Sequence, residues 1–279
     1  MFKRVVFIIV ISFVFTALLL YVFYPGNKNT PHQLESKITE SSVNTLKSKG
    51  NFYLLPKQTA NQIVHYSKFS LSYNENTEQA DWVAYRLYPN SVNNGVKRKN
   101  NFRNDHKIAT ASASLSDYRG SGYDRGHLAP AKAMSFDEQS MSESFLMSNM
   151  SPQLPTFNRG IWKKLEGKVR DLATISDSLY VVTGPILDEN SGSIGTNKVL
   201  IPNAYYKAIL RFRGNEFNGI GFLLKHEKSS RKVTDFTVSI DSIETITGLN
   251  FFYLLDSVQQ QKVESNNSYQ EFVKKTRGQ

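Results

Sequence analysis

Tyr123-Asp124-Arg125-Gly126-His127-Leu128-Ala129-Pro130 places a cation, a glycine and an imidazole in three consecutive positions. Alternate residues of a strand point to the same side, so we expect Arg125 and His127 to face one way and Asp124 the other. An imidazole takes protons from water near neutral pH, and a guanidinium is a planar fork that matches phosphate oxygens. The missing side chain of Gly126 would let a substrate backbone approach closely. These residues together indicate attack of water on a phosphodiester.

A second segment, Phe157-Asn158-Arg159-Gly160-Ile161-Trp162, begins an amphipathic helix that we expect to run from Asn158 to about Ile175. The amide oxygen of Asn158 is a hard ligand of the kind that Mg²⁺ accepts while keeping several of its waters. Asn158 would equally serve as a helix N-cap, and a Glu166–Arg170 pair is common on exposed helix faces. The apolar stripe of this helix holds Ile161, Leu165, Val169 and Leu172, and a second stripe holds Asn158, Trp162, Glu166 and Arg170.

In this order, the two segments resemble the DNA/RNA non-specific endonucleases, the ββα-metal nucleases marked by the motif Asp-Arg-Gly-His. The resemblance covers roughly residues 51–256. It implies an α+β fold in which helices flank a mixed or antiparallel β-sheet core, with a ββα-metal finger at the active site. The other matching motifs are Trp82-Val83-Ala84-Tyr85, Tyr118-Arg119-Gly120-Ser121-Gly122, Ser148-Asn149-Met150-Ser151-Pro152-Gln153, Val182-Thr183-Gly184-Pro185 and Ile201-Pro202.

The resemblance also implies a role for each matching side chain. His127 corresponds to the general base, and Asn158 to the direct ligand of one metal ion, Mg²⁺ or another divalent cation such as Mn²⁺. Glu166 corresponds to a carboxylate that reaches the metal through water, and Asp124 supports the motif without doing chemistry. The catalytic phosphate contacts correspond to Arg125, to Arg170 and to an arginine of the basic loop, for which Arg98 is the better match and Arg103 the alternative.

The predicted activity is hydrolysis of DNA and RNA with little sequence preference, leaving 5′-phosphate ends. A net charge of +10 agrees with a polyanionic substrate. The alternative is a catalytically inactive, membrane-tethered nucleic-acid receptor, and the joint presence of His127, Asn158 and Arg125 argues against it. A zinc hydrolase is disfavoured because no two histidines have paired ligand spacing. The absence of cysteine excludes disulfides and thiol catalysis.

Residues 1–24 predict a membrane anchor. Residues 5–23 are almost entirely apolar and long enough to cross a hydrocarbon core as a helix. Lys3 and Arg4 precede this run, so the positive-inside rule places everything after Tyr24 outside the cytoplasm. A cleaved signal peptide is the alternative, although no small-x-small cleavage pattern follows the apolar run. We expect a single-pass membrane protein with a periplasmic or extracellular catalytic domain, secreted if the segment is cleaved.

Composition divides the rest into a polar linker over 25–50, a nuclease domain over 51–257 and a polar, basic, loosely ordered tail over 258–279. We expect both strands of the ββα finger within 114–129 and a loop at 148–153. Turns are expected at Gly184-Pro185 and Gly214-Asn215, and a helix C-cap at Gly248. Sheet strands are expected at 69–73, 82–88, 179–182, 198–201, 204–212 and 217–224.

Overall fold

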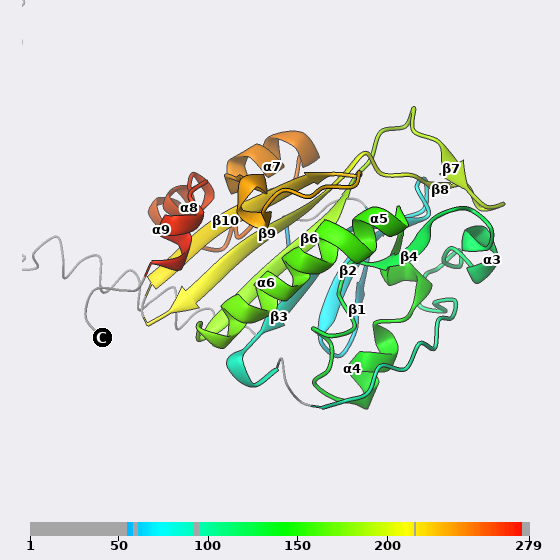
Figure 1. Ribbon diagram of the computed structural model, residues 1–279, viewed down its shortest axis with the longest axis horizontal. Coiled ribbons are helices and arrows are strands. Elements are labelled where there is room, and N and C mark those ends of the chain that lie inside the picture. The colour runs from blue at the N-terminus through cyan, green and yellow to red at the C-terminus, as the bar shows by residue number, and fades with distance from the viewer. Residues whose placement is uncertain (1–54, 58–60, 92–94, 215, 275–279) are drawn as a thin grey trace, which may run out of the picture. The chain divides into compact units, whose positions relative to one another are not determined.

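A seven-stranded sheet is the centre of the protein in a computed structural model, which describes residues 55–57, 61–91, 95–214 and 216–274. All pairings of this sheet are antiparallel, in agreement with the predicted α+β fold. In spatial order its strands are β1 (Gln62–His65), β2 (Phe69–Asn74), β3 (Gln79–Leu87), β6 (Ser178–Ile186), β9 (Ala204–Arg213), β10 (Glu216–Lys225) and β11 (Thr237–Val238) (Figure 1).

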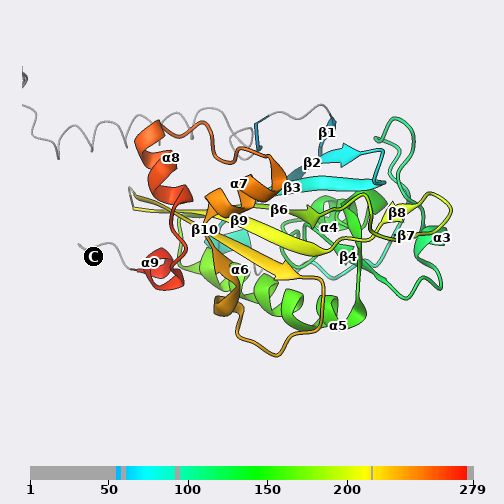
Figure 2. The ribbon, with the colours of Figure 1, turned by 90° about the horizontal axis from the view of Figure 1, so that it is seen from above.

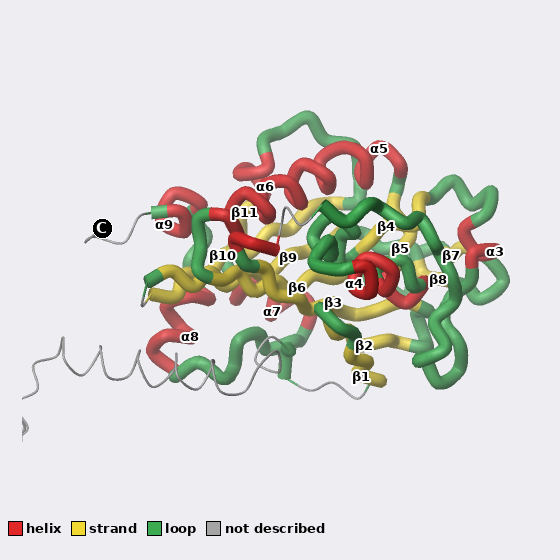
Figure 3. The backbone as a smooth tube through the Cα atoms, turned by 90° about the horizontal axis from the view of Figure 1, so that it is seen from below, coloured by secondary structure: helices red, strands yellow, loops and turns green. Residues whose placement is uncertain are grey.

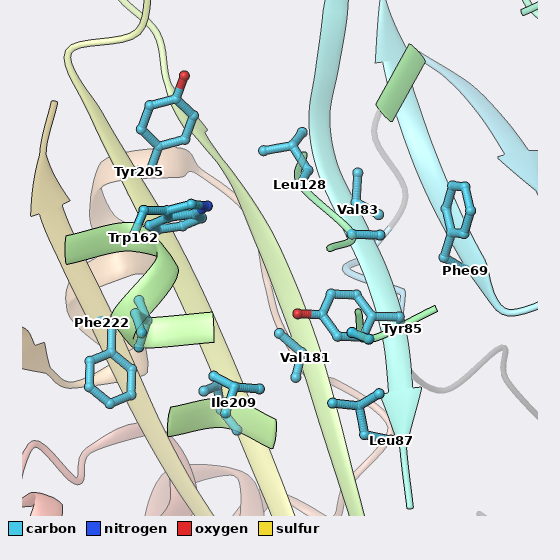
Figure 4. Close-up of a cluster of buried hydrophobic side chains, with 14 of the residues drawn as sticks. Phe69, Val83, Tyr85, Leu87, Leu128, Trp162, Val181, Tyr205, Ile209 and Phe222 are labelled. Atoms are coloured by element: carbon cyan, nitrogen blue, oxygen red, sulfur yellow. The ribbon is translucent and has the colours of Figure 1, made fainter. Parts of the chain in front are cut away.

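Helices cover both faces of the sheet: α5 (Pro155–Phe157), α6 (Lys163–Thr174), α7 (Ile240–Thr247), α8 (Ser257–Glu264) and α9 (Tyr269–Val273). Successive side chains of a strand alternate between the faces, so each face has its own apolar core. Tyr85 and Ile209 belong to the core beneath α6 (Figure 4). Trp82 and Ala208 belong to the core beneath α7 and α8. Figure 2 shows α5 and α6 on one side of the strands, with α7 and α8 on the other.

The helix that carries Asn158 begins at Pro155, earlier than expected. It passes through a π-helical turn, Asn158–Trp162, where Gly160 has φ −99° and ψ −113°, before α6 continues it. Such turns insert an extra residue and are frequent at functional sites. Asn158 therefore lies inside the helical segment, and its side chain bonds to Asp124, so the N-cap interpretation is wrong.

A two-stranded ribbon beside the sheet corrects the expected arrangement of the ββα finger. Residues 114–129 hold a short helix, α3 (Leu115–Tyr118), and only one strand, β4 (Asp124–His127). The second strand is β5 (Met150–Gln153), where a loop was expected, and it pairs antiparallel with β4. Long loop segments connect this ribbon to its neighbours (Figure 3). The two strands of the finger are therefore far apart in the sequence, and a helix, α4 (Glu138–Glu143), lies between them.

Buried hydrogen bonds tie the ribbon to the central sheet and hold its two strands together. The hydroxyl of Ser151 donates to Oε1 of Gln79 at 2.6 Å and lies 2.8 Å from the hydroxyl of Tyr205. The side chain of Asn149 donates to the carbonyl of Ala129 at 3.0 Å and accepts from its N–H at 2.8 Å. These bonds fix the end of β4, and they explain why polar residues of the 148–153 motif are buried.

Two expectations for the later strands are wrong. β6 runs through Gly184 and Pro185, where a turn was expected. The pairing of β6 with β3 ends at Thr183, so among the described strands Pro185 pairs only with β9. Proline has no backbone N–H, and on the β3 side no hydrogen bond is lost because β6 is no longer paired there. Residues 198–201 contain only β8 (Val199–Leu200), which pairs with β7 (Ser193–Ile194) in a separate ribbon.

The C-terminal segment packs on the sheet, contrary to the expected loose order. Val263 of α8 and Phe272 of α9 are buried in the cores of the two faces. Nη2 of Arg211 donates to the carbonyl of Lys274 at 3.1 Å, and its guanidinium lies 5.4 Å from the centroid of the Phe272 ring. The expected C-cap at Gly248 is present, with φ +69°. Few apolar residues anchor this segment, which is why its composition resembles that of an unfolded tail.

The predicted anchor over 1–24 and the linker over 25–50 lie outside the described residues. Among the helices of the described ranges, none is both long and apolar enough to cross a membrane. The predicted domain boundaries after residues 50 and 257 stay predictions.

Candidate active site

A hollow of about 280 Å³ is lined by all six side chains that were predicted as catalytic, metal-binding or phosphate-binding residues. Among the residues that the structure describes, Glu166 is the only carboxylate that lines it, and the other charged lining residues are cationic. Such a surface attracts anions. The predicted residues are Arg98, Arg125, His127, Asn158, Glu166 and Arg170, and the remaining lining residues are Pro130, Ala131, Lys132, Arg159 and Lys163.

His127 is buried at the end of β4, between two aromatic rings. The ring centroids of Phe102 and Phe145 lie 5.7 and 4.9 Å from that of the imidazole, both in edge-on contacts. Burial, followed by the charge of Arg98 and then that of Arg125, lowers the pKa of His127 to about 3. The imidazole is therefore neutral near pH 7, which is the form that accepts a proton.

The same two rings hold the two arginines. The guanidinium of Arg125 lies 4.2 Å from the centroid of the Phe102 ring, and that of Arg98 lies 4.8 Å from the centroid of the Phe145 ring. A guanidinium stacked on a ring keeps its plane, and with it the geometry for a two-pronged contact with phosphate. Phe102 thus contacts both Arg125 and the His127 imidazole, and Phe145 contacts both Arg98 and the same imidazole.

Arg103, the alternative to Arg98, has a structural position instead. Its Nη1 donates to the carbonyl of Ser142 at 2.9 Å and to that of Asn101 at 3.2 Å. Its backbone N–H donates to the carbonyl of Phe145 at 3.3 Å. These bonds fasten the basic loop to the α4 region, and Arg98 is the arginine of this loop that lines the hollow.

Asn158 is oriented by Asp124. Nδ2 of Asn158 donates to Oδ2 of Asp124 at 2.9 Å, which leaves the amide oxygen as the atom available to a ligand. Arg159 donates to both oxygens of the same carboxylate, at 2.6 and 2.9 Å. The first residue of β4 therefore joins the ribbon to the π-helical turn, as expected of a supporting residue.

Glu166 and Arg170 enter the hollow from α6, one helical turn apart. Burial raises the pKa of Glu166, and the charges of Lys207 and Arg170 pull it the other way. Lys207 lies beneath the helix, fully buried, with its Nζ 3.1 Å from Oγ1 of Thr183 and 4.4 Å from the centroid of the Trp162 ring. This lysine of β9 adds positive charge below the hollow, and the sequence analysis assigned it no role.

Gly126 lacks a side chain because of packing against the paired strand, and not because substrate approaches it as expected. A Cβ built on it would lie 2.2 Å from the side chain of Gln153 on the paired strand. Gly126 is buried and makes room for this glutamine, whereas Arg125 and His127 line the hollow. The glycine thus allows the ribbon to pack, and the expected close approach of substrate at this position is wrong.

Lys132, Arg159 and Lys163 line the hollow but were not predicted as site residues. Lys132 follows the Asp-Arg-Gly-His motif closely, Arg159 lies within the π-helical turn, and Lys163 directly follows that turn. Their positive charge could have indicated a phosphate-binding role. Charged residues on a loop or a helix usually only face solvent, however, so charge alone did not single them out.

The oxygen donors of the hollow fit a hard divalent cation that is shared with an anionic ligand. The amide oxygen of Asn158 and the carboxylate of Glu166 are ligands of the type that Mg²⁺ takes. The surrounding cations oppose an isolated ion, so phosphate oxygens would have to complete its shell. A separate group of carboxylates, Asp241, Glu244 and Glu264, has oxygens within 4.8 Å of one another. It lies on α7 and α8, across the sheet from α6.

Comparisons with known proteins find nucleases. A family model described as DNA/RNA non-specific endonuclease matches residues 24–258. A nuclease of Syncephalastrum racemosum is 34% identical over 276 residues, which cover 87% of this chain and 86% of that protein. Human mitochondrial endonuclease G is 33% identical over 205 residues, covering 68% of this chain and 69% of that protein. A crystal structure of an EndoG/EndoGI complex, which concerns inhibition of EndoG, has a TM-score of 0.69, with 30% identity over 75% of this chain and 93% of that one.

Proposed function

Because the chain belongs to the DNA/RNA non-specific endonuclease family and is a nuclease, we propose that it cleaves the backbones of both DNA and RNA at this hollow. The observation that carries the proposal is the convergence of His127, Asn158 and three arginines on one cavity. Contacts to phosphate position a nucleic acid without reading its bases, so we expect little sequence preference.

His127 acts as the general base. It takes a proton from the water that attacks phosphorus, while Arg98, Arg125 and Arg170 neutralise the phosphate. The positive charges of Arg98 and Arg125 also lower the pKa of the imidazole. A bound phosphate offsets those charges, so substrate binding raises the pKa of His127 and makes it a stronger base when it is needed.

Asn158 would hold one divalent cation directly and Glu166 would reach it through water, and we propose that this ion is Mg²⁺. When bound, such an ion stabilises charge on the phosphate and on the departing 3′ oxygen. Cleavage at that bond leaves 5′-phosphate ends. Asp124 keeps the amide oxygen of Asn158 available for this role through the hydrogen bond to Nδ2.

The test is incubation of residues 51–279 with supercoiled plasmid and with total RNA, in Mg²⁺ and in EDTA. We expect both substrates to be degraded only in the presence of the metal, with products that a 5′-phosphate-dependent exonuclease digests further. His127→Ala should abolish cleavage while DNA binding in a gel shift is retained. If the protein binds DNA but cleaves it with none of the divalent ions tested, the result would support the inactive receptor instead.

We propose in addition that the nuclease is exported and anchored by its N-terminal segment. The support is the apolar run at residues 5–23, preceded by Lys3 and Arg4. The full-length chain should fractionate with membranes, and protease added outside intact cells or spheroplasts should digest the nuclease domain. Recovery of the activity in the cytosolic fraction would contradict this.

A further inference from the structure

A second hollow, of about 210 Å³, adjoins the first at Arg125, which lines both. Its walls come from α3, from the turn that follows and from the start of β4. Asp124 is already bonded to Arg159 and Asn158, so Arg119 and Arg125 supply the charge that remains available to a ligand. The lining residues are Leu115, Tyr118, Arg119, Tyr123, Asp124 and Arg125.

Local hydrogen bonds build the turn that carries Arg119. The N–H and the hydroxyl of Ser121 donate to the carbonyl of Tyr118 at 3.3 and 2.9 Å. The hydroxyl of Ser121 in turn accepts from the N–H of Tyr123 at 3.1 Å. Gly122 has φ +84°, a conformation that side chains with a Cβ rarely adopt. The turn therefore sets Arg119 and Tyr123 beside the hollow before any ligand arrives.

Tyr118 contributes a buried hydroxyl that lacks a partner. Its side chain is 5% exposed, and no hydrogen bond to its hydroxyl is present in the described part of the chain. Burial raises the pKa of this phenol, so it keeps its proton and can donate. A buried polar group left unbonded destabilises the folded protein, and an acceptor oxygen in the hollow would relieve that cost.

Two further wall residues, Arg119 and Tyr123, match the two parts of a nucleotide. Arg119 is exposed and forms no ion pair with any described residue, so its planar fork is available for a phosphate. Tyr123 is half-buried and presents an aromatic ring, on which any of the bases can stack. Continuity through Arg125 places this chemistry directly next to the catalytic hollow.

We propose that the second hollow binds the nucleotide adjoining the scissile phosphate of the same strand. Arg119 contacts the phosphate of that nucleotide, the hydroxyl of Tyr118 donates to one of its oxygens, and the ring of Tyr123 packs on its base. The inference rests on the proposed nuclease function, because the catalytic hollow must hold the neighbouring phosphate. None of these contacts reads a base edge, so the subsite adds affinity without adding sequence preference.

The first test measures binding without catalysis. The affinity of the nuclease for a fluorescein-labelled single-stranded oligonucleotide is read by anisotropy in EDTA, for wild type, Arg119→Ala, Tyr123→Leu and Tyr118→Phe. We expect Kd to rise on the order of tenfold for Arg119→Ala and Tyr123→Leu, in line with the loss of one stacked base or one phosphate contact. Tyr118→Phe should weaken binding without lowering Tm, because its hydroxyl stabilises nothing in the free protein. The matched control, Arg213→Ala at the far end of β9, should bind as wild type.

The second test separates the subsite from the chemistry. Bis(p-nitrophenyl) phosphate has one phosphodiester and no neighbouring nucleotide. Arg119→Ala should raise KM for the oligonucleotide while this small diester is hydrolysed at the wild-type rate. An unchanged oligonucleotide Kd, or equal losses on both substrates, would overturn the subsite. A wild-type protein that cleaves neither substrate would overturn the nuclease proposal instead, and the EDTA binding series would still report on Arg119.

Discussion

Nδ2 of Asn158 donates a hydrogen bond of 2.9 Å to Oδ2 of Asp124, so the first residue of β4 sets the orientation of the proposed metal ligand. Asp124→Ala would free the amide to rotate and would release Arg159. We expect the Mg²⁺ concentration for half-maximal cleavage to rise by roughly 10–100-fold, as is typical when the group that orients a metal ligand is removed. Magnesium titrations of plasmid cleavage measure this, with the exposed Asp171→Ala as the matched control. An unchanged magnesium dependence would remove Asp124 from this role.

Replacing Arg125 by lysine should be damaging although the charge is kept. Lysine cannot stack its head group on the Phe102 ring or offer a planar fork to phosphate. We expect kcat/KM on DNA to fall by about 10–100-fold, which corresponds to roughly 1.4–2.7 kcal/mol of lost transition-state binding. Arg231→Lys is a close control, because Arg231 also stacks on a phenylalanine, Phe236, at 4.8 Å and does not line the hollow. Equal rates for wild type and Arg125→Lys would mean that charge alone suffices.

The buried His127 should make the protein less stable in acid. Its folded-state pKa lies well below the unfolded value of about 6.5, so below that pH the unfolded chain binds a proton that the folded protein does not. The free energy of unfolding should therefore fall as the pH drops from about 6.5, by at most about 1.4 kcal/mol per pH unit from this group. Urea titrations at several pH values test this, and His127→Gln should show a shallower dependence. Parallel curves for the two proteins would contradict the shift.

His226 should stabilise the start of the helix that carries Asn158. Its Nε2 accepts from the N–H of Leu154 at 2.7 Å, and its Nδ1 lies 2.8 Å from the carbonyl of Pro202, so the neutral ring bridges both. His226→Phe would keep the aromatic packing but leave the N–H of Leu154 unbonded, at a cost of about 1–3 kcal/mol. Thermal or urea unfolding gives this value. A variant as stable as wild type would show that the bridge is dispensable.

The C-terminal helix should be part of the folded core. Phe272→Ala would empty a fully buried position under the sheet and should cost about 3–5 kcal/mol of unfolding free energy. Val258→Ala is the control from the same tail, because Val258 is 74% exposed and its loss should change stability by less than about 0.5 kcal/mol. Equal stability of the two variants would mean that α9 does not contribute to the core.

The sequence correctly predicted the features that depend only on the periodicity of a single strand or helix. The alternation of β4 correctly placed Arg125 and His127 together, and the helical period of α6 correctly buried Leu165 and Val169. The resemblance supplied the residues that meet across elements, such as Arg98, because no local pattern links a loop to a distant helix.

The missed features depend on distant partners or on irregular backbone. β5 is four residues long and includes Pro152, and only its pairing with β4 and the bonds of Ser151 to the sheet make it a strand. A π-helical turn leaves no periodic trace that distinguishes it from a regular helix. The tail was misjudged because a few buried residues, Val263 and Phe272, hold two otherwise polar helices.

β3 and β6 are neighbours in the sheet, and Leu87 pairs with Leu179. When these two residues pair, they close a loop of about ninety residues. Closing the loop lowers the entropy of the chain, and contacts that form later in folding must offset this cost. That loop contains every residue of the catalytic hollow. During synthesis the whole catalytic set is therefore made before the strand that completes the scaffold beneath it. A nascent chain therefore already contains every residue of the hollow, and we expect it to cleave nucleic acid only after β6 has paired with β3.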